Sequence, residues 1–266
     1  MSMAAPIVIQ PSVTSQPDVT MLAKQQCGVP MPPKGIPDYP PGLEHLIGID
    51  KLRVCQSVDM LKMFTTFEHA NKYTIKTGSG DHVYSATEDT GYCTRFCCGT
   101  LRSFDVEIVD RSEKRAVLYI SRPWRCQSCW FPCCMQKLAV TASTGNVGYV
   151  VQDWSFWTSD ISIKNQNDET VLKIVGPWLT FATCCSDSVF KILATDGTQI
   201  GQINKKWSGL CKELFTDADN FNITFPIDLD VRVKATLLAA LLLIDYMYFE
   251  GVPVNLIGSL VTQLGL

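Results

Sequence analysis

The sequence predicts a mainly β protein in which a closed antiparallel β-barrel surrounds a hydrophobic helix near the C-terminus. From Gly42 onward, apolar and polar residues alternate with a period of two, and turn signals recur between runs rich in Val, Ile, Phe, Tyr and Thr. A strand-rich unit occurs twice, which is typical of a barrel formed by duplication. A long apolar segment follows the strands, and a barrel wide enough to enclose a helix would bury it.

The composition agrees with a large folded domain and excludes several classes of protein. The chain has 266 residues and a mass of 29.6 kDa, and at 46% hydrophobic and 18% charged residues it is too apolar to be intrinsically disordered. It lacks the several long apolar runs of a channel that crosses the membrane many times. The net charge of −3 and the isoelectric point of about 5.6 supply no basic field, so nucleic-acid binding is not expected.

Residues 1–41 form a proline-rich arm that we expect to be extended and disordered. They hold nine of the 14 prolines and show little hydrophobic period. The stretch from Pro30 to Pro33 has the PxxP spacing that SH3 and WW domains bind, although a plain tether has the same composition. The N-terminus does not resemble a secretion signal, so we expect the 12 cysteines in a reducing compartment.

Turn signals divide the chain after the arm into short strands. They lie at residues 77–80, 143–146, 165–168 and 196–197. The clearest alternation runs from Ile227 to Val233, where apolar side chains face one way and Asp228, Asp230 and Arg232 face the other. This alternation predicts a strand.

The repeated unit begins with a strand that leads into a Pro-Trp pair. Pro123-Trp124 recurs as Pro177-Trp178, at an offset of 177 − 123 = 54 residues. Further matches follow in the same order at offsets of 51 to 53: Cys133-Cys134 with Cys184-Cys185, Gly145 with Gly197, Gly148 with Gly201, and Trp154-Ser155 with Trp207-Ser208. Two such units fit a closed barrel better than an open solenoid, which needs about three or more repeats.

Ala235 to Phe249 is apolar nearly all the way round and predicts a helix that is buried on every side. These residues would span about 22 Å, less than the ~30 Å of the hydrocarbon core, and Asp245 at the bilayer centre would cost about 3 kcal/mol. Glu250, Gly251 and Pro253 prevent a longer helix. We therefore expect the helix to fill the barrel rather than to span a membrane.

The segment RCQSCWFPCC places Cys126, Cys129, Cys133 and Cys134 within nine positions. Four thiolates can bind Zn²⁺, but the adjacent pair Cys133-Cys134 fits a tetrahedral site poorly. Buried packing is a second interpretation. Thioacylation is the third, because clustered cysteines can carry several acyl chains, and two chains hold a protein stably on a membrane.

An acidic stretch, TDADNFNITFPID, precedes the last predicted strand and the helix, and its oxygen-rich side chains suit Ca²⁺. With Asp217 in the first position, the match to an EF-hand loop is poor, because Asn222 replaces the turn glycine and Asp228 replaces the bidentate glutamate. We expect a dissociation constant of about 10⁻⁴ M or above. A metal-free acidic turn is the alternative.

Familiar catalytic motifs are missing from the sequence. It has neither HExxH nor GxSxG, and no Gly-rich loop ending in Gly-Lys, so neither an enzyme nor ATP coupling is expected. The three histidines, His45, His69 and His82, carry no local signature of a Cys-His hydrolase. Lys205 and Lys206 are expected on a solvated face.

Several longer motifs together resemble those of the phospholipid scramblase family. They are CTRFCCGTLRSF, SRPWRCQSCWFPCC, the two Trp-Ser pairs, TDADNFNITFPIDLDV and ATLLAALLLIDYMYFE. The resemblance implies a tubby-like fold, a β-barrel of about twelve strands around a hydrophobic C-terminal helix. We accordingly divide the chain into an arm (1–41), a barrel domain (42–250) with its central helix at 235–249, and a tail (251–266).

The resemblance also implies passive, ATP-independent and Ca²⁺-activated movement of phospholipids in both directions between bilayer leaflets. Residues 201–210, with Lys205 and Lys206, resemble a nuclear-import signal. By the same analogy palmitate is attached at Cys129, Cys133 and Cys134, and the Ca²⁺ segment comprises Asp217, Asp219, Phe221, Ile223, Phe225 and Asp228.

The implied partner is a phospholipid membrane, met at the cytoplasmic face of the plasma or an organelle membrane, with a nuclear pool as a further location. A lipid headgroup needs a polar path or a thinned bilayer to cross hydrocarbon, and one short helix bearing Asp245 offers no such path. Scrambling by a filled barrel would thus require a homo-oligomer or a large rearrangement. The alternative function is a membrane-tethered lipid-binding or adaptor module with a signalling or nuclear regulatory role.

Overall fold

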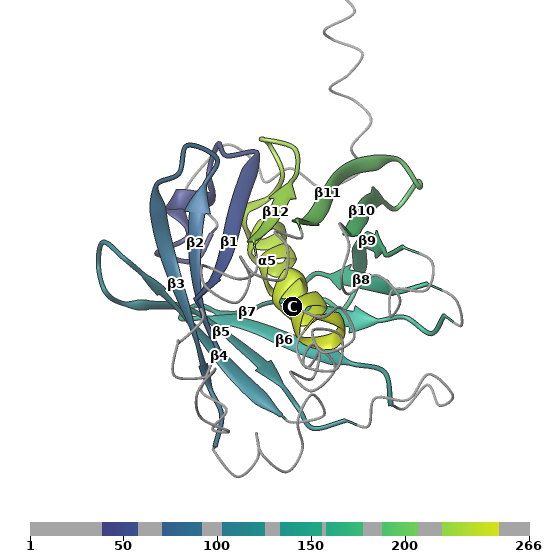
Figure 1. Ribbon diagram of the computed structural model, residues 1–266, viewed down its shortest axis with the longest axis horizontal. Helices are drawn as coiled ribbons and strands as arrows, with labels where there is room; N and C mark the ends of the chain where they lie inside the picture. The colour runs from purple at the N-terminus through teal and green to yellow at the C-terminus, as the bar shows by residue number, and fades with distance from the viewer. Residues whose placement is uncertain are drawn as a thin grey trace, which may run out of the picture.

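Twelve antiparallel strands close into a barrel around one long helix in the computed structural model of the chain (Figure 1). The structure describes residues 39–57, 71–91, 103–125, 134–155, 158–177, 188–206 and 220–249. In chain order the elements are η1 (Glu44–Leu46), β1 (Lys51–Ser57), β2 (Lys72–Thr77), β3 (His82–Asp89), β4 (Phe104–Asp110), β5 (Ala116–Arg122), β6 (Lys137–Ala142), β7 (Gly145–Gln152), β8 (Asp160–Lys164), β9 (Thr170–Val175), β10 (Ser188–Ala194), β11 (Gln199–Lys206), β12 (Asn220–Thr224) and α5 (Val231–Tyr248).

Each strand pairs with its neighbours in sequence, and β1 pairs with β12 to close the barrel. Val54 in β1 lies opposite Phe221 of β12 on one side and Ile75 of β2 on the other. Side chains alternate between a buried inner face and a more exposed outer face, as in β4 and β10. The predicted closed antiparallel barrel is therefore confirmed.

The sequence repeat corresponds to four strands. Its two copies are β5 to β8 and β9 to β12, with Pro123 after β5 and Pro177 after β9. Of the paired glycines, Gly145 is the first residue of β7 and Gly197 lies in the turn before β11. Both have a positive φ, which explains why glycine occurs in these tight turns. Strands β1 to β4 form a third unit of the same pattern, one that the sequence comparison did not reveal.

The helix α5 begins four residues earlier than predicted, and the strand expected from Ile227 to Val233 is wrong. Asp230 is the N-cap residue, and its carboxylate accepts hydrogen bonds from the backbone N–H groups of Arg232 and Val233. This cap supports a helical first turn, although the sequence alternates there as it would in a strand. The last strand is instead β12, where Phe221 and Ile223 point into the core.

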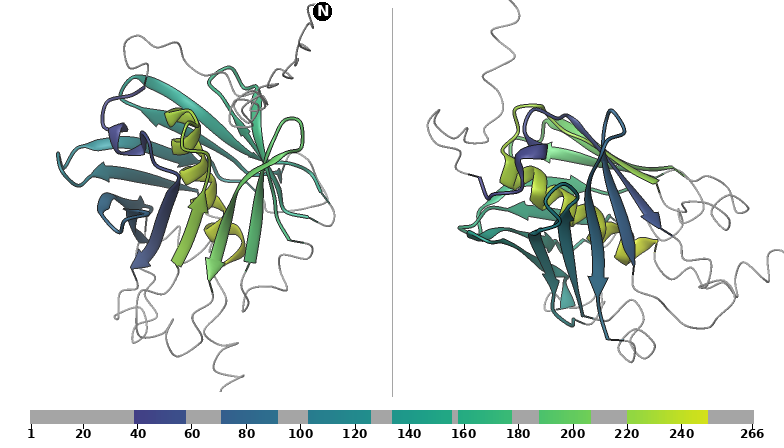
Figure 2. Two further views of the ribbon diagram at one scale, coloured as in Figure 1. Left: turned by 90° about the horizontal axis from the view of Figure 1, so that it is seen from above. Right: turned by 90° about the vertical axis from the view of Figure 1, so that its left-hand side faces the viewer.

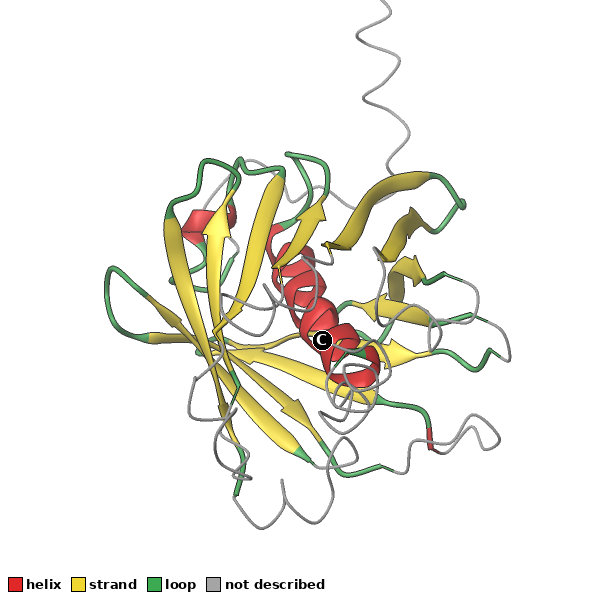
Figure 3. Cartoon of the chain, viewed as in Figure 1, coloured by secondary structure: helices red, strands yellow, loops and turns green. Residues whose placement is uncertain are grey.

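The helix runs through the interior of the barrel, as Figures 2 and 3 show. Leu238 and Leu242 are almost fully buried, and the buried residues of α5 lie on all of its sides. The expectation that the apolar helix fills the barrel is therefore confirmed.

Within the described part of the chain, no helix combines the length and the apolar character that crossing a bilayer requires.

The barrel has two unlike ends. At one end, the five strand-to-strand turns from β2–β3 to β10–β11 contain two to five residues; we call it the short-turn end. At the other end, the six connections from β1–β2 to β11–β12 contain seven to fourteen residues; we call it the long-connection end. Because the strands alternate in direction, α5 starts at the short-turn end and finishes at the long-connection end.

Candidate functional site

The last turn of α5 is surrounded by buried polar side chains at the long-connection end. The Tyr246 hydroxyl donates to Glu88 Oε1 at 3.0 Å, and the Tyr73 hydroxyl donates to Asp245 Oδ2 at 2.7 Å. The backbone N–H of Asn71 donates to the other Glu88 oxygen at 3.3 Å. These contacts tie the end of the helix to β2 and β3, and they explain how the helix keeps Asp245 in an apolar interior.

Two basic side chains also face this end of the helix. The Arg122 guanidinium lies 5.4 Å from the ring centroids of both Phe104 and Tyr246. The Lys205 ammonium lies 3.8 Å from the Phe249 centroid. Cations near the C-terminus of a helix are stabilised by its unpaired carbonyl groups and by the aromatic faces. Lys205 is buried, so the expected solvated face is wrong for this residue.

A row of polar side chains, buried at Arg122 and Gln136 and half-buried at Gln152, joins three neighbouring strands at the rim of the long-connection end. Arg122 Nε donates to Gln136 Oε1 at 2.9 Å, and the Gln136 backbone N–H donates to Gln152 Oε1 at 3.1 Å. Trp124 and Trp154 each lie two residues beyond this row, and their side chains are 58% and 57% exposed. The rim therefore combines a fixed polar base with two outward aromatic residues.

The short-turn end is held by a buried lysine at the start of α5. Lys234 Nζ donates to the carbonyl oxygens of Leu46, Ile49 and Ile227 at 3.1, 2.8 and 2.9 Å. Burial lowers the pKa of Lys234 to about 8, against the opposing effect of nearby carboxylates such as Asp228. One ammonium thus links the segment before β1, the β12–α5 turn and the helix.

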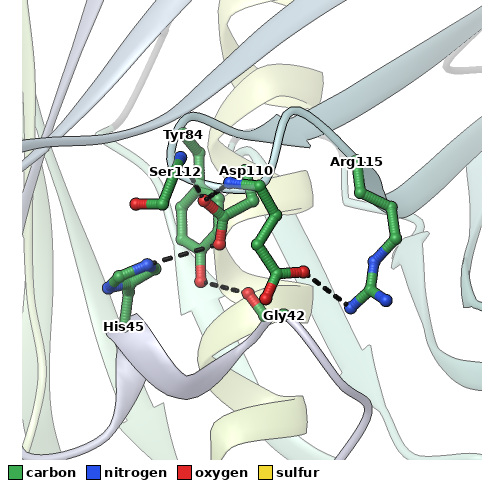
Figure 4. Close-up of polar contacts among 7 residues, drawn as sticks. Gly42, His45, Tyr84, Asp110, Ser112 and Arg115 are labelled. Carbon is green, nitrogen blue, oxygen red and sulfur yellow. Dashed lines mark hydrogen bonds and ion pairs between the residues drawn. The ribbon is translucent and has the colours of Figure 1, made fainter.

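A strap before β1 closes the same end (Figure 4). The Tyr84 hydroxyl donates to the Gly42 carbonyl at 2.8 Å, and His45 Nε2 lies 3.3 Å from Asp110 Oδ2. Burial, helped by the charge of Asp110, raises the pKa of Tyr84, which keeps this donor protonated. The strap is therefore fastened to β3 and to the end of β4.

The predicted Ca²⁺ residues do not form one compact loop in the described structure. Phe221, Ile223 and Phe225 are buried in the core, and the backbone of β12 is paired with β1 and β11. Asp228 lies in an exposed turn at the short-turn end, whereas Asp217 and Asp219 are outside the described residues, in the connection at the opposite end. The Ca²⁺ assignment of this segment therefore stays a prediction.

The predicted acylation residues are only partly covered. Cys134 is partly buried, whereas Cys129 and Cys133 lie outside the described residues, so palmitate at these three positions stays a prediction. Among the residues that the structure covers, no group of His, Cys, Asp and Glu side chains is arranged to hold a metal ion. His45 and His82 lie at the short-turn end and Cys134 at the other, so this cysteine and these histidines do not form a catalytic pair.

Sequence reasoning missed Lys234, Glu88, Arg122 and the two exposed tryptophans as a set. The sequence signal that could have identified Lys234 is its position directly before the apolar segment that begins at Ala235. The Pro-Trp and Trp-Ser pairs marked the tryptophans as repeated but did not show that they share a rim. The side chain of Lys206 lies outside the described set, so its predicted role in nuclear import stays a prediction.

Comparison with known proteins identifies the family of this chain. The family model described as Scramblase matches residues 29–251. The chain belongs to the scramblase family. It is 47% identical to rat "Phospholipid scramblase 1" over 80% of this chain and 64% of that protein, and 46% identical to bovine "Phospholipid scramblase 2" over 83% and 74%. It is 42% identical to human "Phospholipid scramblase family member 5" over 85% and 84% of the two chains.

The chain thus spans somewhat less than two thirds of the rat relative's length. No solved structure gives a significant match.

Proposed function

We propose that this protein moves phospholipids in both directions between bilayer leaflets, without ATP and under the control of Ca²⁺. The observation that carries the proposal is the family match over residues 29–251, together with relatives, one of them 47% identical, that are named phospholipid scramblases. The activity is a translocation rather than a chemical conversion.

We further propose that palmitate on Cys129, Cys133 and Cys134 holds the protein on the cytoplasmic face of a membrane. Support comes from the clustering of these cysteines with bulky apolar neighbours, and from Cys134 lying at the rim that carries Trp124 and Trp154. Hydroxylamine, which cleaves thioesters, should release the protein from membranes, and the variant with all three cysteines replaced by alanine should be released without it.

Calcium is proposed to act through the connection that contains Asp217 and Asp219. Both carboxylates belong in sequence to the long-connection end, the end at which the cysteine cluster also lies. Ca²⁺ bound there would be close to anionic headgroups that could complete its oxygen coordination, which fits a site of weak intrinsic affinity. We also propose that part of the protein is located in the nucleus, that the active form is a homo-oligomer, and that SH3 or WW domains dock on the arm.

A second candidate function is a tethered lipid-binding or adaptor module. It is favoured by the enclosed position of α5, because a helix packed on all sides by strands gives a headgroup no polar path. An adaptor of this kind would bind membranes without exchanging lipids between leaflets.

The test uses purified full-length protein reconstituted into liposomes that contain a fluorescent lipid, with an impermeant quencher added outside. A scramblase makes nearly all the label accessible in the presence of Ca²⁺, whereas an adaptor leaves the inner half protected. The variant Asp217→Ala with Asp219→Ala should lose the Ca²⁺ response.

Asp228→Ala is the matched control, because it removes an acidic side chain of the same stretch at the other end of the barrel. An equal loss of response in the control variant would reject the Ca²⁺ assignment. Absence of exchange by the wild-type protein at any Ca²⁺ concentration would reject the proposed activity.

A further inference from the structure

The rim of the long-connection end exposes two tryptophans on a fixed backbone. Tryptophan is among the most buried side chains on average, yet Trp124 and Trp154 are 58% and 57% exposed. They follow β5 and β7, which flank β6 in the barrel. The two indoles therefore belong to one stretch of the rim.

Neighbouring residues hold each tryptophan in place. On one side of Trp124, Arg122 is bonded to Gln136, and on the other side Arg125 Nη1 donates to the Met135 carbonyl at 3.0 Å. Such anchoring on both sides presents the ring outward from a defined backbone.

Trp154 is bracketed in the same way. The Asp153 carboxylate accepts from the Ser162 hydroxyl at 2.6 Å, and the Asp153 backbone N–H donates to the Asp160 carbonyl at 2.9 Å. The Thr158 backbone N–H donates to the Ser155 hydroxyl at 3.2 Å. The exposure of both rings is thus a consequence of the built rim rather than of an unanchored loop.

The distribution of tryptophan along the chain points in the same direction. By their positions in the sequence, all six tryptophans belong to the segments that join strands at the long-connection end. Four of them, Trp130, Trp157, Trp178 and Trp207, lie outside the described residues. Tryptophan is the residue that concentrates where apolar and polar phases meet, because its ring is apolar and its N–H needs a partner.

Cys134 lies between the two tryptophans along the rim, at the entrance to β6. Its carbonyl accepts a hydrogen bond from Gln136 Nε2 at 3.2 Å, so it is attached to the same polar row. An acyl chain on this cysteine would leave the barrel at the edge that presents the indoles.

We propose that the barrel meets the phospholipid bilayer end-on, with Trp124 and Trp154 inserted at the headgroup level. The inference rests on the proposed function and deepens it by naming the surface that faces the lipid. It also orients the molecule: the strap at Gly42, where the proline-rich arm joins the barrel, lies at the end away from the bilayer.

Full-length protein made without acyl chains, mixed with vesicles of phosphatidylcholine and phosphatidylserine, tests the proposal by co-sedimentation. The variant Trp124→Ser with Trp154→Ser should partition about tenfold more weakly, since two aromatic surfaces no longer leave water. Ile47→Ser with Ile227→Ser is the matched control, because these side chains are 48% and 59% exposed at the short-turn end. It should bind as the wild type does.

Hydrogen exchange of the wild-type protein gives a second measurement that needs no variant. Vesicles should slow exchange at residues 121–125 and 151–155, but not at the turns 111–115 and 165–168. Equal loss of binding in both double variants, protection at the short turns, or no binding by the unacylated wild type would each overturn the proposal.

The two ideas fail separately. If the protein binds vesicles through this rim but exchanges no lipid, the proposed function is rejected and the docking surface is retained. If the protein exchanges lipid but the double tryptophan variant binds vesicles as well as the wild type does, only the docking surface is rejected.

Discussion

The two ends of the barrel are built from the same strands but differ in the length of their connections and in what those connections carry. At the short-turn end, the turns are two to five residues long, and the Tyr84 hydroxyl and the Lys234 ammonium donate to backbone carbonyl groups of the segment before β1. At the long-connection end, the strands lead into connections of seven to fourteen residues that carry the cysteine cluster and every tryptophan. The difference indicates that one end mainly stabilises the fold, while the other presents chemistry on a base that the fold supplies.

This division predicts that substitutions at the short-turn end lower stability and leave vesicle binding intact. Substitutions at the exposed rim should do the reverse. Polar groups around the last turn of α5 are the intermediate case, because they are buried but lie at the long-connection end.

The largest effect is expected for Gly42→Ala. Gly42 has a φ of +93°, and an added Cβ would lie 2.2 Å from Val117 Cγ1. Backbone strain and the clash should together lower the free energy of unfolding by about 3 kcal/mol, measured by urea denaturation.

Gly80→Ala is the matched control for this glycine. It has a similar φ of +100°, but nothing lies within 4 Å of the added atom. It should cost about 1 kcal/mol. Equal losses in the two variants would mean that the strap at Gly42 is not tightly packed.

Lys234→Met should lower the free energy of unfolding by about 2 kcal/mol at neutral pH. The methionine fills a similar volume and removes a buried charge, but the carbonyl groups of Leu46, Ile49 and Ile227 lose their donor. Denaturation measures the loss, and vesicle binding of the folded variant should be unchanged. A variant as stable as the wild type would show that water replaces the ammonium.

Tyr246→Phe tests the intermediate region and should cost about 1.5 kcal/mol. It leaves the aromatic contact with Phe104 in place but removes the hydroxyl that donates to the buried Glu88 carboxylate. Tyr119→Phe, on the exposed outer wall, is the control and should have almost no effect. If both variants were neutral, the long-connection end would contribute less to stability than its buried polar contacts indicate.

The pH dependence of stability should reveal the protonation of Lys234. Its pKa is about 8 in the folded protein and 10.5 ordinarily, so between these values the unfolded chain binds more protons. Stability from this group is therefore fully present above pH 10.5 and is lost as the pH falls through 8. The free energy of unfolding should rise by about 1 kcal/mol between pH 8 and pH 9, and this increment should be absent in Lys234→Met.

The smallest effect on stability is expected at the rim. Trp124→Ser and Trp154→Ser should each change the free energy of unfolding by less than about 0.5 kcal/mol, because both side chains are mostly exposed. A thermal melt of each variant measures this. A loss above 1 kcal/mol would contradict the division, since it would give the rim a part in holding the fold together.

The sequence by itself determined the strands, the tight turns and the burial of the apolar helix. Glycines mark the turns at Gly145 and Gly197, and Asp245 limits where α5 can lie. These features follow from local periodicity and backbone preference, which the order of residues expresses directly. The same periodicity misleads from Ile227 to Val233, because a single capping carboxylate, Asp230, decides between strand and helix there. Phe221 and Ile223, which the family resemblance assigned to the Ca²⁺ segment, lie inside the barrel, and only the structure showed this.

Only the tertiary structure decided which residues meet at each end. Tyr73 and Asp245 are 172 residues apart, and Lys234 reaches a carbonyl 188 residues away. These partners are brought together by the closure of β1 on β12 and by the path of α5 along the barrel. The shared rim of Trp124, Cys134 and Trp154 arises in the same way. Closure of a barrel is a property of all twelve strands at once, so no local pattern of residues encodes the neighbours that it creates.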